Sequence, residues 1–226
     1  MTELKIQNRD NKFHKDAFDK TSEDRRNKVL EIALDEFASK GYSATSINDI
    51  ARNAGVSIGA MYSYFASKED LFLAIVNEGH FLMVDILTEI GESSADIFDC
   101  IQKMLHASRY FALEHAQLNQ IYLDLTTQAL SPLSQRLSNK IEQVTPVMLS
   151  KIIKKAQVDG LVSHQVDARV ASFCIDNIFM IYQFSFSSDY YKERMKMYLG
   201  DDVLSDIEAV ESRMFEFIKC AILNCH

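Results

Sequence analysis

Residues 51–72 read ARNAGVSIGAMYSYFASKEDLF, and one tight turn divides this stretch into two short helical segments. Before the turn, apolar residues recur at helical spacing from Ile47 to Ala54, which predicts a short helix. Gly55 permits the positive φ that a tight turn needs, and Ser57 is a suitable N-cap for the next helix. Two short helices joined by a glycine-containing turn are typical of a helix-turn-helix.

The second helix of this pair carries the features that favour DNA binding over an αα-hairpin that only packs. Such a helix can lie in the major groove with its N-terminal residues toward the base edges. Gly59 costs up to about 1 kcal/mol relative to alanine in a helix, which is understandable if another surface approaches its backbone. Hydroxyls of Tyr62, Ser63 and Tyr64 can donate to phosphate oxygens. Lys68 adds a cation at the start of the next helix, beside free backbone N–H groups.

The remaining sequence predicts an all-α protein, because only two prolines occur and no run of alternating β-branched residues stands out. One helix is expected before the helix-turn-helix, from Ser22 to Lys40, and a long one after it, from Ser67 to Gly91. Further helices are predicted at residues 95–115, 117–130, 133–159, 167–187, 190–199 and 203–223. Residues 1–21 are polar and unpatterned, so we expect a flexible arm there.

The segment from residue 22 to residue 72 combines several short motifs at fixed spacing. They are Phe37 with Gly41-Tyr42, then Thr45-Ser46, Ile50-Ala51, Gly55-Val56-Ser57, Tyr62-Ser63-Tyr64-Phe65 and Ser67-Lys68-Glu69. Together, and without a gap, these motifs resemble the N-terminal region of TetR-type transcriptional regulators. The resemblance implies a helix-turn-helix domain of three helices (22–66), followed by a helical-bundle domain for ligand binding and dimerisation (67–226) that begins with a connecting helix (67–90).

The resemblance also implies a function: a regulator, most often a repressor, that binds near-palindromic double-stranded operator DNA as a homodimer. The residues implied in DNA contact are Thr45, Ser46, Ser57, Ile58, Gly59, Ala60, Tyr62, Ser63, Tyr64 and Lys68. Ile58 and Ala60 depart from the family pattern, where lysine and threonine are common. Ile58 can contact a thymine methyl group or pack against the first helix, and the sequence leaves both open.

For the second domain, the resemblance implies a cavity for a small-molecule effector among the middle helices. Many aromatic and methionine residues lie there, which suits an apolar or amphipathic molecule, although ordinary bundle core explains most of them. The residues expected to line the cavity are His106, Tyr110, Tyr122, Phe179 and Gln183. Helices 167–186 and 203–223 carry more apolar surface than one buried face needs. They are therefore expected to form the dimer interface through Phe173, Phe179, Phe215, Ile218 and Ile222.

The charge distribution agrees with this division. The chain has a formal net charge of −8, yet residues 1–66 hold ten basic and ten acidic residues. The whole acidic excess therefore lies outside the expected DNA-binding domain. Basic residues supply phosphate contacts, and an acidic body elsewhere discourages non-specific association with nucleic acid.

Other kinds of site and location find little support in the sequence. The histidines show no metal-ligand spacing, no nucleotide-binding or metalloprotease motif occurs, and we expect no metal, no cofactor and no enzymatic activity. The cysteines form no Cys-x-x-Cys pair and are expected to be structural. No apolar run approaches the roughly 18 residues of a membrane span, and the first residues lack a signal-peptide pattern. We expect a cytoplasmic protein; an all-α carrier or enzyme, and a DNA-binding protein without a ligand, are the alternatives.

Overall fold

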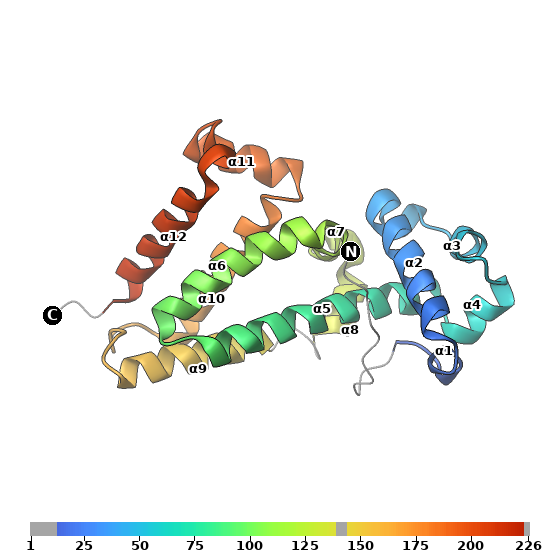
Figure 1. Ribbon diagram of the computed structural model, residues 1–226, viewed down its shortest axis with the longest axis horizontal. Helices are drawn as coiled ribbons and strands as arrows, with labels where there is room; N and C mark the ends of the chain where they lie inside the picture. The colour runs from blue at the N-terminus through green and yellow to red at the C-terminus, as the bar shows by residue number, and fades with distance from the viewer. Residues whose placement is uncertain (1–12, 139–143, 224–226) are drawn as a thin grey trace. The chain divides into compact units, whose positions relative to one another are not determined.

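The computed structural model describes residues 13–138 and 144–223 (Figure 1). Apart from one isolated bridge between Val162 and Leu223, the regular structure of these residues is helical. The prediction of an all-α fold is confirmed. The chain forms two compact units, Met1–Leu82 with Gln117–Ile141, and Met83–Ala116 with Glu142–His226. Each unit is described separately below.

The first unit contains the helix-turn-helix. Its helices are α1 (Asp16–Asp19), α2 (Glu23–Ala44), α3 (Ile47–Ala54), α4 (Ile58–Tyr64), the first part of α5 (Lys68–Ser93), α7 (Ala116–Leu125), the 3₁₀-helix η1 (Gln128–Leu130) and α8 (Ser131–Ser138). The bounds of α3 and α4 agree with the sequence-based expectation. In α2, Gly41 has a φ of 75° and breaks the regular helix close to the predicted end at Lys40.

Aromatic side chains form the core of this unit. Phe18, Phe37, Phe65 and Phe72 are almost fully buried. The ring centroids of Phe37 and Phe72 are 5.0 Å apart, and those of Phe18 and Phe65 are 4.7 Å apart. Rings at these separations add to the stability that burial of their surface provides. The core therefore joins α1, α2 and α5 to the end of α4.

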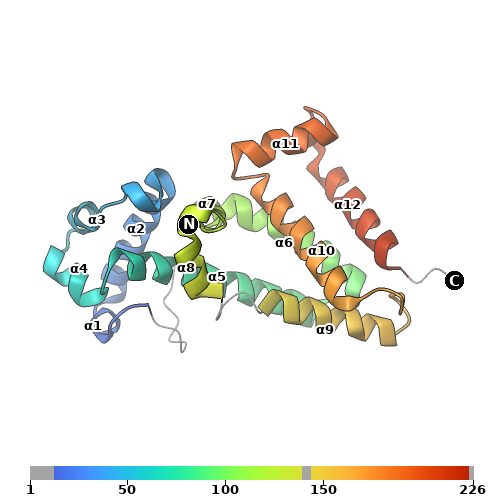
Figure 2. The ribbon, with the colours of Figure 1, turned by 180° about the vertical axis from the view of Figure 1, so that it is seen from behind.

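Residues 13–21 are not the flexible arm that the sequence predicted. They contain α1, which packs on α4 and can be seen beside it in Figures 1 and 2. Helix α1 has only four residues, too few to be stable alone. Its order comes from a tertiary contact, the complete burial of Phe18. No periodic pattern in the sequence predicts this burial. Residues 1–12 lie outside the described residues.

The segment of α7, η1 and α8 is also held to the first unit by polar contacts. Gln117 Nε2 donates to Asp35 Oδ1 on α2, at 2.5 Å. Arg136 on α8 pairs with Glu69 and Asp70 in the first turn of α5. Residues 117–138 therefore lie with the N-terminal helices, although the sequence-based division placed them with the second domain.

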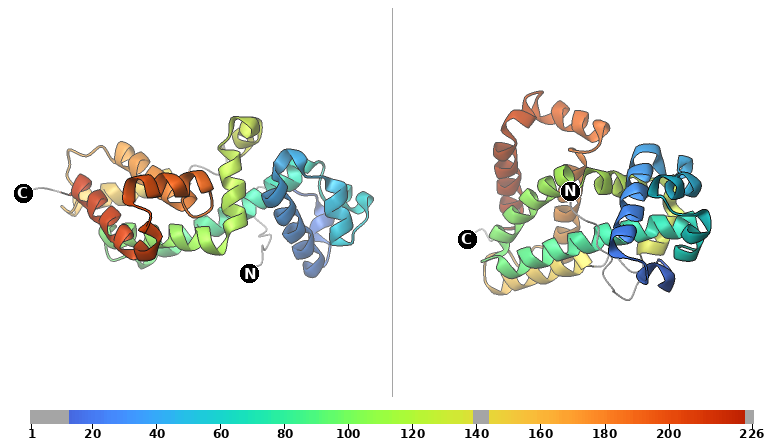
Figure 3. Two further views of the ribbon diagram at one scale, coloured as in Figure 1. Left: turned by 90° about the horizontal axis from the view of Figure 1, so that it is seen from above. Right: turned by 45° about the vertical axis from the view of Figure 1, so that its right-hand side comes forward.

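The second unit is a helical bundle, and Figure 3 shows its later helices from two further sides. Its helices are the end of α5, α6 (Ile97–Glu114), α9 (Val144–Val158), α10 (Ala168–Phe184), α11 (Asp189–Leu199), the 3₁₀-helix η2 (Val203–Asp206) and α12 (Ile207–Ile222). Helix α10 packs against both α6 and α9, and α12 packs against α6. Met104, Ile153, Ile175, Phe179 and Ile218 are among the buried residues of this core.

The single helix predicted for residues 133–159 is wrong, because two helices, α8 and α9, occupy this region. Both prolines lie in first turns: Pro132 is the second residue of α8 and Pro146 is the third residue of α9. Proline lacks a backbone N–H and clashes with a preceding helical carbonyl, so it is tolerated in the first turn but not in the interior. Pro146 therefore favours a helix start near residue 144.

Helix α5 corrects a second expectation. By length and composition it is apolar enough to cross a membrane, although the sequence analysis found no such stretch. Of its most apolar window, 56% is buried inside the structure, and Leu71–Gly79 are buried without interruption. A core helix meets the same two criteria because it contacts other helices on several sides.

Candidate nucleic-acid interface and small-molecule cleft

The turn between α3 and α4 is fixed by its backbone. Gly55 has a φ of 72° and lies in the left-handed region. Its N–H donates to the carbonyl of Arg52, and the N–H of Val56 donates to that of Ala51 at 3.0 Å. These bonds satisfy carbonyls at the end of α3 that have no partner within the helix. A glycine adopts this conformation without strain, so Gly55 sets the angle at which α4 leaves α3.

Both short helices begin with a serine cap. Ser46 Oγ accepts a hydrogen bond from the N–H of Asn48, and Ser57 Oγ accepts one from the N–H of Ala60. Each cap satisfies one of the backbone donors that a helix start leaves unpaired. Ser46 and Ser57 therefore have a structural role, in addition to the DNA contact that the resemblance implied.

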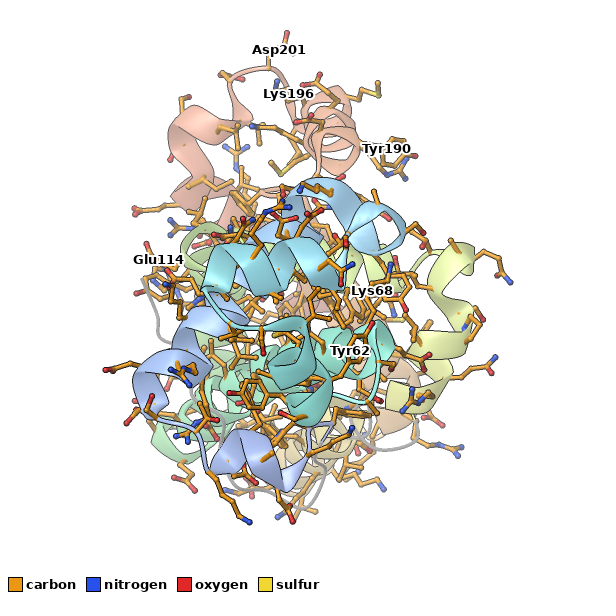
Figure 4. The ribbon with its side chains drawn as sticks, turned by 90° about the vertical axis from the view of Figure 1, so that its right-hand side faces the viewer. Tyr62, Lys68, Glu114, Tyr190, Lys196 and Asp201 are labelled. Carbon is orange, nitrogen blue, oxygen red and sulfur yellow. The ribbon has the colours of Figure 1, made fainter. Side chains whose placement is uncertain are left out.

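Helix α4 exposes one side, which includes its N-terminal turn, and buries the other. Ser57, Gly59 and Ser63 are exposed, and Ile58 and Tyr62 are each 48% exposed. Ile58 is therefore not buried, which disfavours its interpretation as a core residue packed against the first helix. Figure 4 shows this face of the unit, with Tyr62 and Lys68 labelled.

Gly59 has no packing reason to be glycine. A Cβ atom added there would meet only Ser57 Oγ, at 4.0 Å, and the backbone of Gly59 is that of an ordinary helix. An alanine would fit without strain and would favour the helix by up to about 1 kcal/mol. The protein interior therefore does not explain the glycine, whereas a molecule approaching this face would.

Two predicted DNA-contacting residues lie in the interior instead. Thr45 is 3% exposed, and its hydroxyl lies 2.8 Å from the carbonyl oxygen of Gly41 and 3.0 Å from that of Glu36. Tyr64 is 6% exposed and its ring packs against Phe18. These positions stabilise the domain, and sequence spacing could not show which side of the chain they face. Ala60 is half-buried.

Lys68 also differs from its predicted role. Its Nζ donates to the carbonyl oxygens of Tyr42 at 2.8 Å, Thr45 at 3.1 Å and Ser43 at 3.3 Å. It also lies 4.5 Å from the centroid of the Tyr42 ring. An ammonium group has three N–H donors, and all three have acceptors here. Lys68 therefore ties the start of α5 to the end of α2, and no donor remains for a phosphate oxygen.

Comparison with known proteins agrees with this geometry. Residues 29–75 match the family described as bacterial regulatory proteins, tetR family. The chain belongs to the TetR family. The matched residues run from the middle of α2 through α4 into α5, so they contain the whole helix-turn-helix.

Individual TetR-family proteins extend the likeness beyond this region. The transcriptional repressor KstR2 of Mycobacterium tuberculosis is 34% identical over 91 residues, which cover 40% of this chain and 45% of KstR2. The transcriptional regulator HbdR of Aromatoleum sp. (strain CIB) is 31% identical over 144 residues, covering 62% of this chain and 61% of HbdR. The chain thus spans less than two thirds of these curated relatives. A TetR family regulator from Chloroflexus aurantiacus has the same fold, with a TM-score of 0.66, 22% identity, and coverage of 94% and 99% of the two chains.

The second unit of this TetR-family protein contains a cleft of about 710 Å³ between α5, α6 and α12. Apolar side chains, including Ile86, Ile90 and Leu105, line part of it, and polar and charged side chains line the rest. Two of the predicted ligand-binding residues, His106 and Tyr110, lie in this lining. Of the other three, Tyr122 belongs to the first unit, and Phe179 and Gln183 are buried outside the cleft lining.

A charged network that the sequence analysis missed forms one wall of the cleft. Arg109 Nε donates to Glu211 Oε1 at 2.7 Å, and the Tyr182 hydroxyl donates to the same oxygen at 2.9 Å. Arg109 Nη2 lies 3.2 Å from His106 Nδ1. Burial, and next the Glu211 carboxylate, raise the pKa of Tyr182, so the hydroxyl stays protonated and donates. The hydrogen bond to Glu211 raises the pKa of Arg109 further. These partners are 102 and 29 residues from Glu211 in sequence, so spacing could not reveal them.

Some of the predicted dimer residues are buried in the core, and others lie at the surface. Phe179, Ile218 and Ile222 are buried in the core of their own unit, so their side chains are not available to a partner as the sequence suggested. Phe173 is 70% exposed, and Phe215 is partly buried against the core. Val170, Phe173 and Ile181 form an exposed apolar stripe on α10, and Phe217 is exposed on α12.

Within residues 13–138 and 144–223, no group of three or more histidine, cysteine, aspartate or glutamate side chains is placed to hold a metal ion. Cys100 is buried, and Cys174 and Cys220 are exposed. Cys225 lies outside the described residues.

Proposed function

We propose that this protein is a TetR-type DNA-binding transcriptional regulator of the cytoplasm, and that it represses by binding a near-palindromic operator as a homodimer. The exposed face of α4, which presents Ser57, Ile58, Gly59, Tyr62 and Ser63, carries the proposal. A helix of this kind enters the major groove with its N-terminal residues near the bases. Gly59 lets a base edge or phosphate come close to the helix backbone, and the exposed hydroxyls of Ser57 and Tyr62 supply donors for phosphate oxygens.

The roles within this face follow from the position of each side chain. Ile58 is exposed at the start of α4, which suits contact with a thymine methyl group, a group that carries sequence information in the major groove. Tyr62 is later in the helix and suits a phosphate contact, which positions the protein without specifying a sequence. The Ser63 hydroxyl already donates to the carbonyl of Ala60 at 2.7 Å. We therefore expect Ile58→Ala to change base preference, and Tyr62→Phe to weaken binding similarly on all sequences.

A small-molecule effector is the second part of the proposal. The cleft between α5, α6 and α12 combines apolar and charged lining, which suits an amphipathic molecule. A solved KstR2 structure, 20% identical to this chain with a TM-score of 0.61, is described as that of a ketosteroid transcriptional regulator, which agrees with an apolar ligand. Helix α5 belongs to both units, so a ligand that prefers one packing of the second unit can bias the first through this helix.

Dimerisation is the third part. A single helix-turn-helix reads only a few base pairs, and two of them bind half-sites about 34–36 Å apart or a multiple of this spacing. The exposed stripe of Val170, Phe173 and Ile181, together with Phe217, is the apolar surface that we assign to the partner subunit. It replaces the buried residues that the sequence analysis selected.

The decisive experiment is selection of bound sequences from random double-stranded DNA by the purified protein, followed by sequencing. The proposal predicts a motif with two-fold symmetry, and its affinity is then measured by fluorescence anisotropy. A protein that enriches no sequence and binds DNA only weakly at physiological salt would instead support the carrier or enzyme alternative.

The effector is tested by calorimetric titration of a candidate ligand into free and operator-bound protein. Because linkage is reciprocal, a ligand that weakens operator binding must bind the operator complex more weakly by the same factor, typically about 5–150-fold. Equal affinity for both forms would show that the ligand does not act through DNA.

A further inference from the structure

A lysine that the sequence analysis did not select lies at the C-terminal end of α4. The backbone N–H of Lys15 donates to the carbonyl of Tyr64 at 2.7 Å, and Lys15 Nζ donates to the carbonyl of Tyr62 at 2.8 Å. The Lys15 side chain is exposed. Of its three N–H donors, only one has an acceptor among the described residues. The other two remain available to a group outside the protein.

The position of Lys15 is fixed by the segment that follows it. Phe18 is completely buried, and its ring centroid lies 5.1 Å from that of Tyr64 and 4.7 Å from that of Phe65. Arg26 Nη1 on α2 donates to the carbonyl oxygens of Asp19 at 2.9 Å and Thr21 at 2.6 Å. These contacts hold residues 15–21 against α4, and they therefore keep the Lys15 ammonium beside this helix.

The surroundings of Lys15 match those of a phosphate-binding cation. The carbonyl end of a helix carries partial negative charge, which stabilises a nearby cation without neutralising it. Tyr62 and Ser63, the exposed hydroxyl residues of α4, are next to the carbonyl that Lys15 binds. His14 Nε2 lies 2.8 Å from Asp19 Oδ1, so this acid of α1 already has a partner. Asp16 is the exposed acid beside Lys15 in sequence.

We infer that Lys15 binds a DNA backbone phosphate at the C-terminal end of α4, the role that the sequence suggested for Lys68. The inference rests on the proposed function, because it places this contact on the same DNA-binding face. The ammonium of Lys68 is fully used by three carbonyl groups, whereas that of Lys15 is exposed and retains two donors. The segment 13–21 thus has two roles. Phe18 packs against the end of α4 and stabilises it, and Lys15 provides a cation that binds the DNA backbone.

The experiment measures operator affinity as a function of salt concentration for Lys15→Gln. Each phosphate contact by a cation contributes about 0.9 to the slope of log K against log salt concentration. Loss of one contact should lower the slope by about 0.9. When the salt concentration rises from 50 to 200 mM, the fold decrease in the variant's affinity should then be smaller than that of the wild type by a factor of about 3.5. Lys15→Arg keeps the charge and should retain the slope.

Two matched variants separate a phosphate contact from other effects of charge. Lys151→Gln removes one exposed charge from α9, in the second unit, and should leave the slope unchanged. Asp16→Asn removes the acid next to Lys15 and should raise operator affinity. Thermal unfolding of each variant shows whether the domain is still folded at the temperature of the binding measurement.

The outcomes are distinct. If Lys15→Gln lowers the melting temperature but leaves the slope at the wild-type value, Lys15 only caps α4 and the inference is overturned. The same conclusion follows if Lys151→Gln lowers the slope equally. A wild-type protein that selects no DNA sequence would instead refute the proposed function itself.

Discussion

Lys68 Nζ lies 2.8 Å from the carbonyl oxygen of Tyr42 and 4.5 Å from the centroid of its ring, so one ammonium joins the start of α5 to the end of α2. The carbonyls at a helix end have no partner within the helix, and a cation there is favoured by the helix dipole. This contact fixes the start of α5 against the end of α2.

Substitution of Lys68 should therefore affect stability before it affects phosphate binding. Lys68→Met keeps the aliphatic stem but removes the three carbonyl contacts. We expect it to lower the free energy of unfolding by about 1.5–3 kcal/mol, the usual range for hydrogen bonds to a charged group. Urea denaturation measures this change. The slope of operator affinity against salt should stay at the wild-type value, and a slope reduced by about 0.9 would show that Lys68 contacts phosphate after all.

Gly59 and Gly79 make a second, paired test. A Cβ at Gly59 meets only Ser57 Oγ at 4.0 Å, whereas one at Gly79 meets Leu118 Cδ2 at 3.1 Å. We expect Gly59→Ala to raise the free energy of unfolding by up to about 1 kcal/mol while weakening operator binding, because the added methyl group occupies the DNA-facing surface. Gly79→Ala should raise the free energy of unfolding less than Gly59→Ala does, because the Leu118 side chain must move to admit the added methyl group. Denaturation and anisotropy titrations measure the two properties, and a Gly59→Ala variant with unchanged operator affinity would contradict close approach of DNA at this position.

The local features of the helix-turn-helix could be predicted from the sequence because they depend on neighbouring residues. The turn at Gly55 and the cap at Ser57 need only a few adjacent residues, and both are found as expected. Thr45 and Tyr64 could not be assigned in this way. Which side of the chain they face depends on the packing of α2 and on Phe18, and both are buried.

The same limit explains why Lys15 and the charged network of the cleft were missed. Lys15 reaches Tyr62 across 47 residues, and Arg109 reaches Glu211 across 102. No periodicity within one helix encodes these pairs. Phe179 and Ile218 were assigned to the dimer interface because they belong to apolar helices, yet both are buried in the core. The apolar character of a helix does not reveal which of its sides packs against its own bundle.

The pH dependence of stability should contain a contribution from His80. Burial lowers the pKa of His80 from its ordinary value near 6.5 to about 4. As the pH falls from about 6.5 toward 4, the unfolded chain binds a proton at this residue and the folded protein does not, so stability decreases across this window. Below the folded-state pKa both states are protonated and the contribution no longer changes. His80→Gln, which cannot titrate, should show a shallower decrease between pH 6.5 and 4 in urea denaturation, and an unchanged profile would contradict the burial of a neutral imidazole.

The proposed dimer interface can be tested with the cysteines of the protein itself. Cys174 on α10 and Cys220 on α12 are exposed in the single chain, and Cys174 is next to Phe173. If these faces pair in a dimer, a maleimide should label the two cysteines slowly at protein concentrations where the dimer predominates. Cys100 is buried in the core and is the internal reference for a protected thiol.

Phe173→Glu combined with Phe217→Glu places charges on both exposed faces. The double variant should sediment as a folded monomer, should label rapidly at Cys174 and Cys220, and should lose operator binding, because one half-site supports only a few base contacts. Phe179→Glu is the matched contrast: it places a charge in the core and should unfold the second unit. Mass spectrometry of the labelled peptides and sedimentation velocity measure these outcomes. A double variant that remains dimeric, with Cys174 and Cys220 still protected, would move the interface to another surface of the second unit.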